Sequence, residues 1–167
     1  MRISHVYKNR LLTNLNEEQV RVTELYYQMF KRSGAKLNSK NKSRYTEIMS
    51  RLAEIGTEFS QNLLAAEGNW TLSLKESEVE ELPNFLKTSM AQAASDRGLN
   101  GYALILSRSI LEPFLQFSSQ RGLRRDALLA WQERGSSEDG VNNSNLAKEM
   151  LKLRTERAQI LGYKSFA

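Results

Sequence analysis

The sequence contains no cysteine, one histidine and two prolines. Without cysteine, the chain cannot form a disulfide, offer a thiolate to a metal or use a cysteine nucleophile. His5 is the only histidine, so no site that needs two imidazoles can be built from these residues. Because proline is so scarce, long stretches of the chain are free to be helical.

Long apolar runs are missing as well. No run of 18 apolar residues occurs, so we expect no membrane-spanning segment. The first eight residues lack the apolar region of a signal peptide, and we therefore expect a cytoplasmic location. The 167 residues are enough to bury a core, and we predict a single mostly helical segment over 1–167 with no internal domain boundary.

Two long helices are predicted in the first part of the chain. One covers about 16–33, with a capping-box-like start and an apolar stripe formed by Val22, Leu25, Tyr26, Met29 and Phe30. The other covers about 39–66 and carries a coiled-coil-like seam formed by Tyr45, Ile48, Leu52, Ile55 and Phe59. The short turn at 34–38 predicts that these helices form an antiparallel hairpin with the apolar side chains in its core.

The rest of the chain is predicted to be mainly helical with one small sheet. Apolar and polar residues alternate near 70–74 and 101–106, which predicts two paired strands whose relative direction stays open. A polar, glycine-containing loop is expected over 136–144. Further helices are predicted over 83–98, 111–118, 123–134 and 145–161. The fold class is therefore mainly α, with packed helices and one two-stranded β element.

No catalytic, cofactor-binding or metal-ligating residue is predicted. The glycine motifs that bind phosphates or dinucleotides are absent, and so is the nucleophile elbow. The acidic residues Glu76, Glu78, Glu80 and Glu81 could be proposed for a hard cation. We interpret them instead as a solvated entry to a helix, and His5 as a surface residue.

Two basic groups were considered as nucleic-acid sites, since clustered cations can follow a phosphate backbone. One group is Lys36, Lys40, Lys42 and Arg44 beside Tyr45, and the other is Arg121, Arg124 and Arg125. The net charge of +5 is modest, and both groups are interpreted as solvated long side chains at a turn and a helix start. Nucleic-acid binding is therefore not expected. The alternative is a self-standing helical module that binds RNA or a protein partner.

Several stretches, read in order, resemble a known family. They are residues 51–64 with the strand through Trp70, residues 98–106, and residues 121–131 together with 153–167. The helix at 15–35 fits the same pattern. This set resembles the N-terminal, non-catalytic half of the thimet oligopeptidase family of zinc metallopeptidases, and within it the bacterial peptidyl-dipeptidases.

The resemblance implies a fold and a function. Members of the family have two mostly helical halves around a channel that admits short peptides, and peptidyl-dipeptidases remove C-terminal dipeptides. Their zinc is held by an HExxH helix and a downstream glutamate, which this sequence lacks, so no catalytic or ligand residue carries over. The resemblance therefore implies a channel-wall fragment that holds no zinc and is inactive alone.

A fragment of this kind should expose apolar side chains that a missing part would cover. The candidates lie in the later part of the chain and are Phe114, Phe117, Trp131, Tyr163 and Phe166. Uncovered apolar patches favour association. We therefore expect the isolated chain to self-associate, most simply as a two-fold homodimer.

Overall fold

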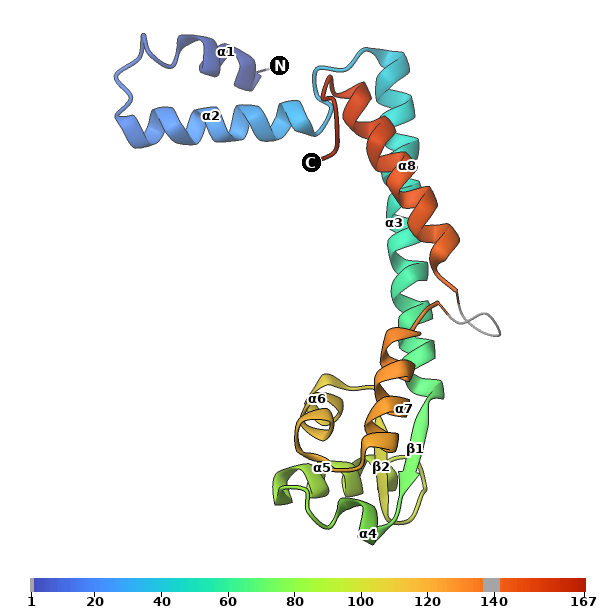
Figure 1. Ribbon diagram of the computed structural model, residues 1–167. Coiled ribbons are helices and arrows are strands. Elements are labelled where there is room, and N and C mark those ends of the chain that lie inside the picture. Colours follow the sequence, from blue (N-terminus) through green and yellow to red (C-terminus); the bar gives the residue numbers. More distant parts are fainter. Residues whose placement is uncertain (1, 137–141) are drawn as a thin grey trace. The chain divides into compact units, whose positions relative to one another are not determined.

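The computed structural model describes residues 2–136 and 142–167. In chain order its elements are α1 (Arg2–Asn9), α2 (Glu17–Arg32), α3 (Ser39–Asn69), β1 (Thr71–Leu74), α4 (Glu76–Val79), α5 (Asn84–Ser95), β2 (Tyr102–Ile105), α6 (Arg108–Phe117), α7 (Arg121–Gln132) and α8 (Ser144–Ile160) (Figure 1). The predicted fold class, mainly α with one small two-stranded sheet, is confirmed.

The chain divides into two compact units. One contains the residues up to Glu54 together with Glu149–Ala167, and the other is Ile55–Lys148. Both α3 and α8 contribute residues to each unit. The expectation that 1–167 has no internal domain boundary stays a prediction, and the units are described in turn.

In the first unit, α2 begins as its sequence predicts. The Asn16 side chain accepts a hydrogen bond from the backbone N–H of Gln19 at 2.9 Å, and the Gln19 side chain accepts one from the backbone N–H of Asn16 at 3.0 Å. This reciprocal pair satisfies two donors that a helix start leaves free. After the helix, Gly34 adopts a φ of +82°, which glycine tolerates without a side-chain clash.

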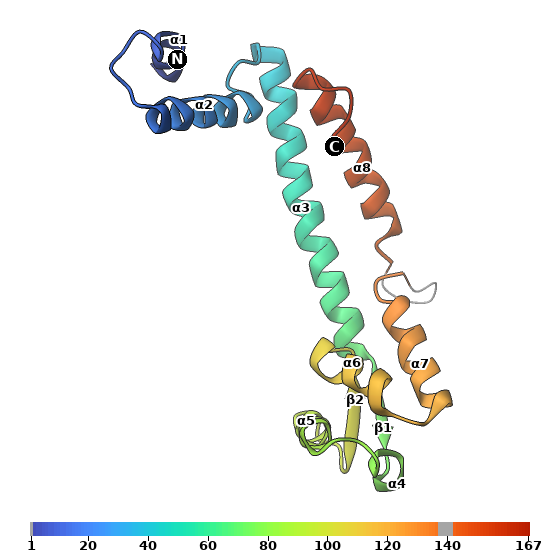
Figure 2. The same cartoon turned by 60° about the vertical axis from the view of Figure 1, so that its left-hand side comes forward.

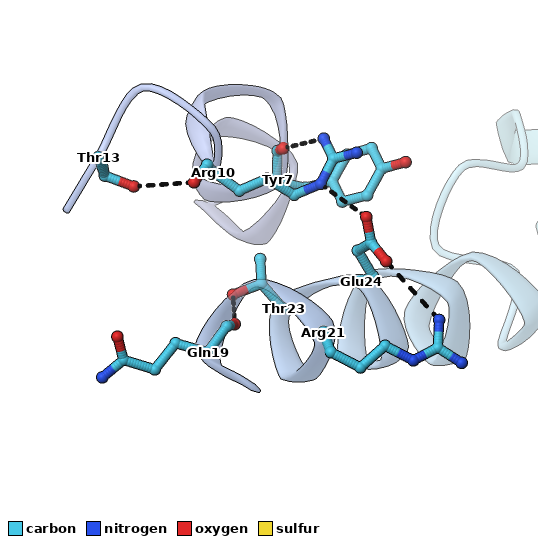
Figure 3. Close-up of polar contacts among 7 residues, drawn as sticks. All are labelled: Tyr7, Arg10, Thr13, Gln19, Arg21, Thr23 and Glu24. Carbon is cyan, nitrogen blue, oxygen red and sulfur yellow. Dashed lines mark hydrogen bonds and ion pairs between the residues drawn. The ribbon is translucent and has the colours of Figure 1, made fainter. Parts of the chain in front are cut away.

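Helix α2 forms a hairpin with α1, a helix that the sequence analysis does not predict. The rings of Tyr7 and Tyr27 stack with centroids 3.8 Å apart, and Arg10 forms an ion pair with Glu24 at 3.0 Å. Figure 3 shows Arg10, the residue directly after α1, reaching down to Glu24 on α2. Tyr27 is the buried residue of α2, so α1 covers the helix face that carries it.

The apolar stripe of α2 lies outside this contact. Its side chains are 41% to 53% exposed, so the expectation that they form the core of a hairpin with 39–66 is wrong. The stripe and Tyr27 lie on different sides of the helix, and α1 covers only the side with Tyr27. We call Val22, Leu25, Tyr26, Met29 and Phe30 the α2 stripe.

The seam of α3 is confirmed, and its partner is α8. Ile48 is completely buried. Arg44 binds both carboxylate oxygens of Glu156 at 2.7 and 2.9 Å, and Arg51 binds Glu149 in the same way at 2.7 and 2.9 Å. The two arginines are seven residues apart, as are the two glutamates, which is the repeat of an antiparallel heptad pairing. Figures 1 and 2 show the two helices side by side along these residues.

The second unit is built around the small sheet. Strands β1 and β2 are antiparallel, with Thr71 opposite Ile105 and Leu74 opposite Tyr102, which settles the direction that the sequence left open. Helices α5 and α6 pack against β2. The buried core comprises Leu74, Val79, Leu82, Leu86, Met90, Ala93, Ala94, Ala103, Leu104, Leu106, Ile110, Leu111, Phe114 and Ala127.

A buried polar side chain anchors the start of α8 in this unit. Asn143 donates to the backbone carbonyl of Phe59 at 3.1 Å and accepts from the side chain of Asn62 at 2.8 Å. Its backbone N–H donates to the carbonyl of Gly135 at 2.6 Å. A Cβ at Gly135 would lie 2.9 Å from the Asn143 amide nitrogen, so only glycine fits there. Of the loop predicted over 136–144, residues 137–141 lie outside the described residues.

We expect that truncation of Phe114 destabilises the second unit far more than truncation of Phe117. Phe114 is 0% exposed, whereas Phe117 is 44% exposed and touches Phe85 edge-on. Loss of a fully buried phenylalanine costs about 3–5 kcal/mol. Urea denaturation of Phe114→Ala and Phe117→Ala, with Phe114→Leu as a milder core change, measures the difference. Equal losses for the two alanine variants would contradict this core.

We also predict that the α3–α8 pairing weakens in acid. The guanidinium of Arg51 lowers the pKa of Glu149, and that of Arg44 lowers the pKa of Glu156. Because the folded pKa values are lowered, the stabilisation is complete above the ordinary glutamate pKa of about 4.3 and is lost as the pH falls through the folded values.

The variant Glu149→Gln/Glu156→Gln should therefore be less stable than the parent chain near neutral pH, and the difference should vanish at low pH. Denaturation midpoints between pH 2 and pH 7 measure it. Glu112→Gln removes an exposed ion pair within α6 and serves as the control. A difference that does not change with pH would show that the two carboxylates are not stabilised by the arginines.

Candidate interaction surfaces

The described residues contain no group of three or more histidine, aspartate or glutamate side chains that could hold a metal ion. His5 lies exposed on α1, where its ring is hydrogen-bonded to Asn9 at 3.2 Å. The zinc of the full-length family would need about three protein ligands around one position. The residues present do not fit that ion. Among the same residues, no helix is long and apolar enough to cross a bilayer.

Three of the acidic residues near β1, namely Glu76, Glu78 and Glu81, are hydrogen-bonded to other groups of this chain. Glu78 accepts from the backbone N–H of Lys75 at 2.7 Å, and Glu81 accepts from the backbone N–H of Ser119 at 2.7 Å and from its hydroxyl. The Ser119 hydroxyl and N–H lower the pKa of Glu81. A hydrogen bond to Glu76 raises the pKa of Tyr102. These contacts tie α4 and the chain after it to neighbouring segments.

In the first basic group, two of the four cations have intramolecular partners. Lys36 donates to the Tyr27 hydroxyl and lies 4.9 Å from the centre of that ring, and it lowers the pKa of Tyr27. Arg44 is held by Glu156, and it also pairs with Glu47 at 3.0 Å. Lys40 and Lys42 are exposed. Only part of the group is therefore available to an external phosphate.

In the second basic group, too, one cation is bound within the chain. Arg124 donates to the carbonyl of Ser118 and is half-buried, while Arg121 and Arg125 are exposed near the start of α7. This group belongs to a different compact unit from the first. Each group is a cluster of three or four cations, of which Lys36, Arg44 and Arg124 bind groups of the chain itself, and this is far from the extended basic surface of a nucleic-acid site.

The aromatic side chains proposed as exposed fall into different classes. Phe114 is completely buried, so its inclusion was wrong. Trp131 packs against the core, and Arg134, which forms an ion pair with Glu67, lies 3.2 Å from the centre of its ring. Phe117, Tyr163 and Phe166 are exposed as expected.

A larger exposed apolar surface lies on α2, where none was expected. The α2 stripe borders a groove of about 690 Å³, lined by Arg21, Leu25, Gln28, Met29, Arg32, Ser33, Tyr45, Met49 and Arg157. Met49, on α3, is itself 38% exposed. A contiguous patch of this kind on a small chain is typical of an interaction site.

Comparison with known proteins gives a consistent set of relatives. No family model matches the chain. The chain is 34% identical to oligopeptidase A of Haemophilus influenzae over 143 residues, which is 82% of this chain and 21% of that protein. It is 32% identical to oligopeptidase A of Escherichia coli, covering 92% of this chain and 23% of that one. It is 26% identical to dipeptidyl carboxypeptidase of Escherichia coli, covering 99% and 25%.

These similarities place the chain among homologues of peptidases. More particularly, the predicted resemblance to the thimet oligopeptidase family is confirmed, because the relatives are oligopeptidase A and dipeptidyl carboxypeptidase. The chain spans about a fifth to a quarter of the length of these relatives, between 21% and 25%.

We predict that the chain binds RNA and DNA only weakly. Each group has only three or four cations, and part of each group is already bound within the chain. Few counterions would therefore be released, so binding should vanish near physiological salt. Fluorescence anisotropy with labelled single-stranded RNA, measured from low to physiological salt, tests this. Submicromolar affinity that survives at physiological salt and is lost in Lys40→Glu/Lys42→Glu, but not in Glu47→Gln, would instead support the RNA-binding module.

Proposed function

We propose that this chain is an N-terminal, non-catalytic channel-wall segment of a peptidyl-dipeptidase-like zinc metallopeptidase, located in the cytoplasm and inactive alone. One observation carries the proposal. The similarity to peptidases extends over 82% to 99% of this chain while covering no more than 25% of each relative. A segment shared at that length is a part of such an enzyme rather than the whole of it.

The residues of the chain support a structural role. In the peptidase family, zinc supplies the activation of the attacking water, and its ligands come from an HExxH helix that this sequence lacks. With His5 as its only histidine, the chain cannot replace those ligands. What the chain does supply is support, through the paired arginines and glutamates of α3 and α8 and through the buried core around Phe114.

The substrate class proposed for the complete enzyme is short peptides. The relatives carry two names, oligopeptidase A and dipeptidyl carboxypeptidase, and identity is higher to the former while coverage of this chain is higher for the latter. We favour removal of C-terminal dipeptides. Cleavage of a blocked hexapeptide by the complete enzyme, followed by mass analysis of the products, distinguishes successive loss of dipeptides from internal cleavage.

The competing proposal is a self-standing helical module that binds RNA or a protein partner. The coding DNA beyond the codon for Ala167 separates the two. An HExxH-encoding sequence there, in frame or shifted, supports the peptidase segment. A stop codon with no such remnant supports the module.

We expect that the isolated chain holds no stoichiometric zinc and cleaves no peptide. Metal analysis after dialysis, and incubation with blocked tripeptides and tetrapeptides, measure the two properties. A complete zinc peptidase of the family, assayed in parallel, shows that the conditions permit cleavage. Chelator-sensitive cleavage that co-purifies with the chain through several columns would overturn the proposal.

A further inference from the structure

The exposed face of α2 contains a heptad repeat that ends in opposite charges. Glu18, Val22, Leu25, Met29 and Arg32 follow one another at spacings of 4, 3, 4 and 3 residues, and all five side chains are exposed. Such spacing places side chains in one row along a helix, where they can meet a facing helix. We call these five residues the α2 seam.

Within the described part of the first unit, Leu25, Met29 and Arg32 of this row border a groove that residues of α3 and α8 also line, and all five side chains of the row stay exposed. Helix α1 occupies the side of α2 that carries Tyr27 and Glu24, as Figure 3 shows for Glu24. Tyr26 and Phe30, the other members of the α2 stripe, lie beside the seam and are 53% and 41% exposed. The row is therefore an exposed helix face with large side chains along it, bordered at its C-terminal half by α3 and α8.

We propose that the α2 seam binds the same seam of a second copy of this chain, in an antiparallel arrangement about a two-fold axis. In that register, Leu25 faces Leu25 of the other copy, Val22 faces Met29, and Glu18 faces Arg32. One sequence then supplies both halves of every contact, as a two-fold interface requires.

The charges at the two ends of the seam select the antiparallel direction. Glu18 lies in the first turn of α2 and Arg32 in the last. A parallel pair would place Glu18 beside Glu18 and Arg32 beside Arg32, whereas the antiparallel pair forms an ion pair at each end. A single helix therefore carries both charges that an antiparallel pair of copies needs, one at each end.

The available area fits a weak, reversible dimer. The α2 stripe, which adds Tyr26 and Phe30 beside the seam, is 41% to 53% exposed, and for large apolar side chains this corresponds to roughly 500 Å² per copy. Two copies that covered the whole stripe would bury at most about 1,000 Å², which is near the lower limit for a specific interface. This proposal uses α2 alone and does not depend on the proposed peptidase function. The dimer interface proposed here lies on α2, whereas the sequence predicts one formed by Phe114 and the aromatic residues after it.

Sedimentation velocity over a hundredfold range of concentration tests the dimer. The parent chain should pass from monomer to dimer, and Leu25→Asp should raise the dissociation constant at least tenfold. Leu64→Asp, at a 70% exposed site on α3, is the matched control and should not change it. A parent chain that stays monomeric throughout, or a dimer that Leu25→Asp does not weaken, overturns the proposal.

A charge exchange tests the direction. Glu18→Arg alone and Arg32→Glu alone should each weaken self-association, because each places like charges opposite each other. An equimolar mixture of the two variants should form a heterodimer more tightly than either forms a homodimer. Circular dichroism must show that both variants keep the helix content of the parent chain. Two helical variants whose mixture associates no better than each alone would overturn the antiparallel register.

Discussion

The pairing of α3 with α8 is the constraint on which the first unit depends, because it joins segments about a hundred residues apart in the sequence. The two bidentate arginine–glutamate contacts are partly exposed, and exposed ion pairs contribute little free energy on their own. Ile48 lies on α3 between the two arginines and is completely buried, and burial of such an apolar side chain is the larger favourable contribution. The ion pairs determine alignment, since a planar guanidinium donates to both oxygens of a carboxylate in few orientations. The arginines thus fix which turn of α3 faces which turn of α8.

Local patterns predicted local structure well. The capping residues of α2, the seam of α3 and the two short strands could each be recognised within a few residues of sequence. The partner of each apolar face could not be predicted in this way, because periodicity shows that a face is apolar but not what covers it. Helix α1 was not predicted because its eight residues bury no side chain; it is attached to α2 through Tyr7 and through Arg10, which directly follows the helix. Phe114 and Phe117 are three residues apart, and only packing distinguishes the buried one from the exposed one.

For the candidate surfaces too, local features could be predicted from the sequence, whereas contacts between distant segments could not. The sequence predicted no catalytic residue, and its family resemblance came from several ordered segments rather than from a reactive motif. The confirmed homology extends over 82% to 99% of this chain and so does not depend on a reactive motif within it. What the sequence could not show is that Arg44 and Lys36 are occupied by Glu156 and Tyr27, or that the stripe of α2 is left open. Both depend on contacts between segments that are separate in the chain.

The buried amide of Asn143 has a chemical consequence for the lifetime of the chain. Asparagine is a thermolabile residue, and it deamidates when the backbone nitrogen of the next residue attacks its side-chain carbonyl carbon. Here that carbonyl oxygen accepts from Asn62, the amide nitrogen donates to Phe59, and the N–H of Ser144 is bound to the side chain of Asn142. The attacking nitrogen belongs to Ser144, the first residue of α8, so the reaction would also have to disturb the start of that helix. The contacts that anchor the helix therefore also protect this asparagine from chemical ageing.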